Sequence, residues 1–174
     1  MKYLVKFVVV TFLVLICTNT FAEQKVVILD LKYVLNNSKA GKGAQDFLKK
    51  SFEDSAKKFT NMEKALKKEE NDLLTKKTVL SKEEYTKKSD ELRKKVIDYQ
   101  SQRRASLDKI TTQRAESREM LIKNIEPLLN AYVKENNISI VIEKKGTLAG
   151  NPEHDITQII VEKLNKELPS LNLK

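Results

Sequence analysis

The sequence is poor in residues that interrupt helices or cross-link a fold. It has four glycines, three prolines, one cysteine, one histidine and no tryptophan, and residues 44–145 contain no glycine. With His154 as its single histidine, the chain offers little for a catalytic triad or a histidine-rich metal site. Gly41-Lys42-Gly43 lacks the spacing of a phosphate-binding P-loop. We therefore expect a protein that is not an enzyme, with no catalytic residues, no cofactor and no metal.

Residues 1–22 have the pattern of a secretory signal peptide. A positively charged start precedes an apolar run over 7–17, and small residues lead to a cleavage site before Glu23. The apolar run is short for a membrane span, which needs about 20 residues. Cys17 follows the bulky Ile16, which argues against lipid attachment. Cleavage would remove Cys17, so the mature chain would fold without disulfides, and we expect it in a bacterial periplasm.

Residues 42–126 are expected to form a helical arm. Their apolar residues are sparse and recur every seven positions, which places one narrow stripe along a helix as in a coiled coil. Such a stripe is too narrow for a globular core. Its members on the first half of the arm are Phe52, Phe59, Leu66, Leu73 and Leu80, with Leu48 and Met62 between them.

Residues 78–81 are the predicted tip of the arm. Ser81 and Glu84 have the spacing of a capping box, which marks the start of a second helix running to about Asn136. Folding at Ser81 makes the two helices antiparallel and places Phe52 roughly opposite Ile110. A single continuous helix through 78–81, dimerising through the stripe, is the alternative.

The remaining residues, 23–41 and 127–174, are expected to form a small body. Strands are predicted at about 25–31, 138–142 and 147–149, and a helix at about 155–168 with Asp155 as its cap. Gly41 and Gly43 are expected to break the chain before the first long helix. The fold class is therefore α+β, mostly α, with a long antiparallel helical hairpin on a small β-containing body.

The predicted sheet is too small to be stable by itself, so we expect the body to self-associate. Pro127 should kink the second helix where the arm enters the body, either as a hinge or as a bend with no role. The residues expected to form the oligomerisation body are Val26, Val27, Ile28, Leu29, Ile138, Ile140 and Ile142.

The excess positive charge lies on the arm. Residues 42–125 contain 22 lysines and arginines against 15 acidic residues. Such a surface attracts anionic partners, and export makes nucleic acid the least suitable of them. The alternative is that the lysines only keep the arm soluble. If the arm binds a partner, the expected contact residues are Phe47, Lys67, Lys68, Leu74, Lys76, Lys77, Val79, Tyr85, Lys87 and Lys88.

The whole predicted mature chain resembles the Skp/OmpH family of periplasmic chaperones for outer-membrane proteins. The resemblance rests on the signal peptide, on VVILDLKYVLNNSKAGK at 26–42, on the glycine-free hairpin, and on ISIVIEKKGTLAGNPEHDITQIIVEKL at 138–164. The best local match is Asp155-Ile156-Thr157, whereas the arm matches in its composition and coiled-coil pattern more than residue by residue.

The resemblance implies a homotrimer whose three hairpins enclose a cavity and hold unfolded β-barrel outer-membrane proteins without ATP. Some family members are credited with a lipopolysaccharide site, but no motif assigns one here. Two other functions stay open from the sequence: a periplasmic coiled-coil spacer or adaptor, and a basic protein that binds anionic envelope lipids or lipopolysaccharide head groups.

Overall fold

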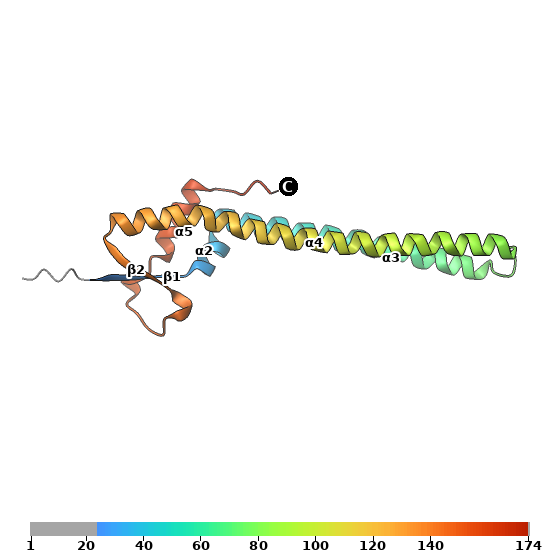
Figure 1. Cartoon of the computed structure of the whole chain (residues 1–174), viewed down its shortest axis with the longest axis horizontal. Coiled ribbons are helices and arrows are strands. Elements are labelled where there is room, and N and C mark those ends of the chain that lie inside the picture. The colour runs from blue at the N-terminus through green and yellow to red at the C-terminus, as the bar shows by residue number, and fades with distance from the viewer. Residues whose placement is uncertain (1–23, 174) are drawn as a thin grey trace, which may run out of the picture.

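The structure, a computed structural model, describes residues 24–173, so the predicted signal peptide and Cys17 lie outside it. Figure 1 shows a long two-helix arm with a small body at one end. The body contains β1 (Lys25–Leu29), α2 (Leu31–Asn37), β2 (Ile138–Glu143) and α5 (Thr157–Glu167). The arm is formed by α3 (Lys39–Thr75) and α4 (Lys82–Glu135). This arrangement confirms the predicted fold class.

The arm is an antiparallel hairpin. With 37 residues in α3 and 54 in α4, the helices extend for roughly 55 and 80 Å at the usual rise per residue. The chain reverses through residues 76–80, so the single continuous helix is wrong. The capping box is present: Ser81 Oγ accepts from the Glu84 amide at 3.2 Å, and Glu84 Oε2 accepts from the Ser81 amide at 3.2 Å.

The seam between α3 and α4 is thin, as the sequence predicts. Phe59 is buried and meets Tyr99 edge to face, with the ring centroids 6.0 Å apart. Ser55 and Ser106 face each other with their hydroxyl oxygens 2.9 Å apart, which agrees with the expected pairing of Phe52 and Ile110. Phe52 itself differs from the expectation, because 53% of it is exposed.

Gly41 and Gly43 do not break the chain, because both lie inside α3. The break falls at Ser38, whose Oγ caps α3 by accepting from the Gly41 amide at 3.1 Å. A Cβ at position 41 would lie 1.9 Å from the backbone oxygen of Leu35 in α2, whereas one at Gly43 would meet nothing within 4 Å. Gly41 is therefore present because α2 and α3 meet closely there.

The described residues form one two-stranded sheet, in which β1 and β2 run parallel. The predicted third strand at 147–149 is wrong: the chain forms a 3-10 turn, η1 (Lys144–Gly146), then a loop and a second such turn, η2 (Pro152–His154). An isolated bridge between Ile28 and Asp155 lies beside β1 instead. β1 ends at Leu29, earlier than predicted, because the next residue, Asp30, caps α2 through its Oδ1.

The three isoleucines of β2 do not share a face. The register shifts after the Lys25–Ile138 pair, so that Val26 pairs with Ile140 and Ile28 with Ile142. Ile138 is buried in the core with Val27 and Leu29, while Ile140 and Ile142 are 49% and 41% exposed. An irregularity of this kind changes which residues of a strand point inward. The set predicted for oligomerisation therefore divides between the chain's own core and an outward face.

Asp155 does not cap the last helix in the predicted way, since α5 begins at Thr157 and Ile156 is its N-cap residue. Asp155 Oδ1 accepts from the Thr157 amide at 2.9 Å, and Oδ2 accepts from Lys144 Nζ at 2.7 Å. Gln158, in the first turn of α5, donates to Glu162 Oε1 at 3.3 Å.

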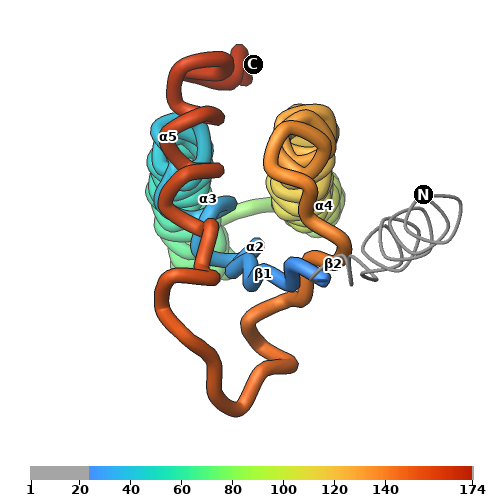
Figure 2. Tube along the Cα trace, turned by 90° about the vertical axis from the view of Figure 1, so that its left-hand side faces the viewer, coloured from blue at the N-terminus to red at the C-terminus, as the bar shows by residue number. Residues whose placement is uncertain are grey.

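The core of the body lies where β1, α2, the end of α4 and α5 meet. Figure 2 shows α5 beside the arm helices, with the two strands below them. The side chains buried there are Val27, Leu29, Val34, Ala40, Leu121, Ile125, Ile138, Ile156, Ile160, Val161 and Leu164.

Helix α4 continues through Pro127 as one element. Pro127 is exposed, while the neighbouring Ile125 is buried. Since proline lacks an N–H, the carbonyl of Lys123 loses its helical donor on the exposed side, where water can replace it. The hinge stays a prediction.

Candidate functional site: the arm surface and the groove at its base

The predicted contact residues of the arm are mostly exposed. The six lysines are exposed, as are Leu74 (55%) and Val79 (83%), while Phe47 and Tyr85 are half-buried. Most of them lie on the far half of α3, at the tip and at the start of α4, but Phe47 lies near the body end of α3. The structure therefore brings together a basic surface with exposed apolar residues at the tip, and leaves Phe47 apart from it.

Lys67 differs from the other lysines of this surface because it is paired. Its Nζ lies 2.8 Å from Glu63 Oε1, one helical turn away. The hydrogen bond from Lys67 holds the pKa of the Glu63 carboxyl below its usual value, and the same bond raises the pKa of Lys67. Both groups are solvent-exposed, so the pair adds little stability.

A second feature is a groove of about 1470 Å³ where α2 and the body end of α3 face α4. Its apolar lining comes from Leu31, Leu35, Leu48, Phe52, Ile110 and Leu121. Seven lysine and arginine side chains also line it, against two acidic ones, Asp30 and Glu143. The groove is therefore apolar in its lining and strongly basic in charge.

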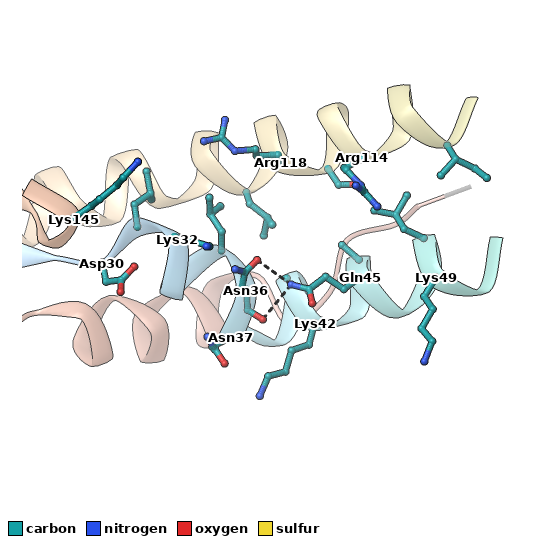
Figure 3. A pocket seen from close by; sticks show the side chains of 18 of the residues that line it. Asp30, Lys32, Asn36, Asn37, Lys42, Gln45, Lys49, Arg114, Arg118 and Lys145 are labelled. Carbon is teal, nitrogen blue, oxygen red and sulfur yellow. Dashed lines mark hydrogen bonds between the residues drawn. The ribbon is translucent and has the colours of Figure 1, made fainter. Parts of the chain in front are cut away.

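The cations of the groove differ in orientation. Figure 3 shows Arg114 turning from α4 toward α3, Lys32 between α2 and α4, and Lys145 reaching toward α4. In the same view Lys42 and Lys49 extend away from the groove. Lys144, another lining residue, is paired with Asp155 at 2.7 Å. Lys32, Arg114 and Lys145 form no ion pair with any residue of 24–173.

The outer face of the sheet is the third candidate surface. Ile140 and Ile142 lie there with about half of their surface exposed, beside the half-buried Val26 and Ile28. Leu148, in the loop after η1, is fully exposed. This face is apolar, and within residues 24–173 the edge of β2 away from β1 pairs with no other strand.

Sequence reasoning proposed the tip lysines and the strand isoleucines as candidates, but not the groove. Its three inward cations come from α2, α4 and η1, which are far apart in sequence, so no linear motif joins them.

Two further observations concern residues 24–173. No three or more of their His, Cys, Asp and Glu side chains cluster so as to hold a metal ion. None of their helices is both long and apolar enough to cross a membrane.

Comparisons with known proteins agree on one family. Residues 25–164 match the family described as "Outer membrane protein (OmpH-like)". The chain is 25% identical over 170 residues to the Skp-like protein of Pseudomonas aeruginosa strain PAO1, covering 95% of this chain and 99% of that one. An OmpH-like protein of Caulobacter crescentus CB15, described as a candidate outer membrane chaperone, has a crystal structure of similar fold. The TM-score is 0.81 at 18% identity, over 86% of this chain and 88% of that one.

Proposed function

Since the chain belongs to the OmpH-like family of outer membrane proteins, we propose that it is an ATP-independent holding chaperone of the periplasm. Its clients would be unfolded β-barrel outer-membrane proteins, held between helical arms before they reach the membrane. The observation that carries the proposal is a basic arm with exposed lysines and exposed apolar residues, joined to a body with half-exposed isoleucines on its sheet.

Holding would depend on many weak contacts rather than on one deep site. The exposed lysines attract acidic segments of a client, and Leu74 and Val79 offer apolar contacts without a fixed shape. A protein that binds the unfolded state preferentially lowers the concentration of free unfolded client by mass action. A thin seam suits this role because the arm can adapt to clients of different size.

We also propose that the body forms a homotrimer through the outer face of its sheet. A two-stranded sheet is marginal by itself, and an exposed edge readily pairs with another chain. Ile140 and Ile142 would be covered by neighbouring copies, with Val26 and Ile28 beside them. Val27, Leu29 and Ile138 serve the chain's own core instead.

The test is suppression of aggregation. Several unrelated β-barrel proteins, unfolded in urea, would be diluted with and without the protein while light scattering is recorded. A holding chaperone keeps all of them soluble at near-stoichiometric ratios, and its affinity falls as salt screens the arm charges. An adaptor would instead bind one folded partner and leave the scattering unchanged.

A second function is favoured by the tip alone. Val79, 83% exposed, is flanked by Lys76, Lys77 and Lys82. An apolar residue among lysines is suited to the surface of an anionic membrane, where it inserts between head groups. Co-sedimentation with phosphatidylglycerol vesicles, abolished by Val79→Asp, would support this function with or without a client.

A further inference from the structure

We propose that the groove at the base of the arm binds an extended, acidic and apolar segment of the client polypeptide. The inference rests on the holding function proposed above, and it assigns the acidic and apolar segments of a client to this groove. The groove combines an apolar lining with the unpaired cations of Lys32, Arg114 and Lys145.

The apolar part of the site comes from α3 and α4. Leu48 and Ile110 are 7% and 8% exposed, and Phe52 stands at the edge of the groove with half of its surface open. Covering Phe52 with an apolar side chain removes apolar area from water, which is the main favourable contribution in most associations. The groove therefore offers Phe52 as its open apolar contact, beside the nearly buried Leu48 and Ile110.

The charged part selects the partner. A guanidinium and two ammonium groups that form no ion pair within residues 24–173 favour carboxylates, because charge-assisted hydrogen bonds are stronger than neutral ones. The lining has seven cationic side chains against the two carboxyls of Asp30 and Glu143, and neither carboxyl forms an ion pair within residues 24–173.

A second copy of this chain fits the groove less well than a client segment does. The arm carries a net positive charge, so the arm of another copy would be repelled by the groove. An extended polypeptide places alternate side chains on opposite sides. A segment that alternates acidic and apolar residues can therefore meet the cations with one side and the apolar lining with the other.

The experiment uses a fluorescein-labelled peptide of alternating leucine and glutamate, with its glutamine counterpart as a control. Binding to the purified protein is measured by fluorescence anisotropy. Lys32→Gln with Arg114→Gln should weaken binding of the acidic peptide about tenfold. Lys50→Gln with Lys57→Gln removes the same charge from exposed positions of α3 outside the groove, and should weaken it less than twofold.

Three results would overturn the inference. One is equal weakening of peptide binding by the two double variants, which would show that the peptide responds to the net charge of the protein and not to the groove. Another is equal affinity for the glutamine peptide. The third is a protein that ignores both peptides but co-sediments with phosphatidylglycerol vesicles through Lys32 and Arg114, which would assign the groove to lipid head groups. Circular dichroism of each variant checks that it is folded.

Aggregation assays on the same samples separate this inference from the proposed function. If the wild-type protein keeps several unfolded clients soluble while the groove variants bind the peptide normally, the groove inference fails and the holding function stands. If the peptide binds through the groove but no client is kept soluble, the site stands and the holding function fails.

Discussion

Replacing Gly41 by alanine should destabilise the protein far more than the same change at Gly43. Both glycines lie in the first turns of α3, two residues apart. The new Cβ at position 41 would lie 1.9 Å from the Leu35 carbonyl oxygen and 2.9 Å from its carbon. These are backbone atoms of α2, so the overlap is relieved only by moving the helix.

The magnitude follows from that overlap. Adding volume to a closely packed contact typically lowers the free energy of unfolding by about 1–3 kcal/mol. Because the neighbour at position 41 is backbone, which cannot rotate away, we expect Gly41→Ala to cost about 3 kcal/mol. At position 43 nothing lies within 4 Å of the new Cβ. Alanine there should stabilise the helix by roughly 0.5–1 kcal/mol, because glycine loses more conformational freedom on folding.

Thermal unfolding followed by far-ultraviolet circular dichroism measures both changes. For a chain of this length we expect Gly41→Ala to lower Tm by roughly 6–12 °C, and Gly43→Ala to raise it by about 1–4 °C. Protein concentration must be equal in all samples, because the Tm of an oligomer depends on it. Equal Tm values for the two variants would refute the close approach of α2 and α3.

Three further predictions concern the sheet face, the Asp155 site and the tip. Ile140→Asp with Ile142→Asp should abolish self-association in sedimentation while leaving the helical spectrum unchanged, whereas Ile159→Asp, at an exposed isoleucine of α5, should not. Burial alone would raise the pKa of Asp155, but hydrogen bonds from Lys144 and Thr157 outweigh it and hold that pKa below its usual value. The ionised form of Asp155 therefore stabilises the fold above about pH 4. In urea unfolding at neutral pH, Asp155→Ala should lower the free energy of unfolding by about 1 kcal/mol. The difference in stability between the wild type and this variant should shrink as the pH falls through the folded-state pKa. Ser81→Ala should speed amide exchange at the start of α4 about fivefold, since it removes a helix cap, and unchanged exchange there would contradict the cap.

The hairpin was predictable because its signals are local. The apolar repeat of α3 depends on side chains one or two turns apart, and the capping box involves Ser81 and Glu84 alone. Even the alignment of the two helices follows from the position of the turn, as the contact between Ser55 and Ser106 confirms.

The errors arise where tertiary contacts decide the local structure. Gly41 and Gly43 look like a break in sequence, but only packing against Leu35 explains why a glycine is needed inside α3. The shift in register after Ile138 depends on the partner strand. The groove could not be predicted from the sequence for the same reason, because Lys32 and Arg114 come to line one groove only in the folded chain.

The central claim is that copies of this chain assemble and hold an unfolded outer-membrane protein. Light scattering after size-exclusion chromatography gives the mass of the purified protein alone and after mixing with a β-barrel protein diluted from urea. We expect three chains in the free state, and a complex heavier by one client that remains soluble. A stable monomer whose mass does not change in the presence of the client would contradict both the trimer and the chaperone.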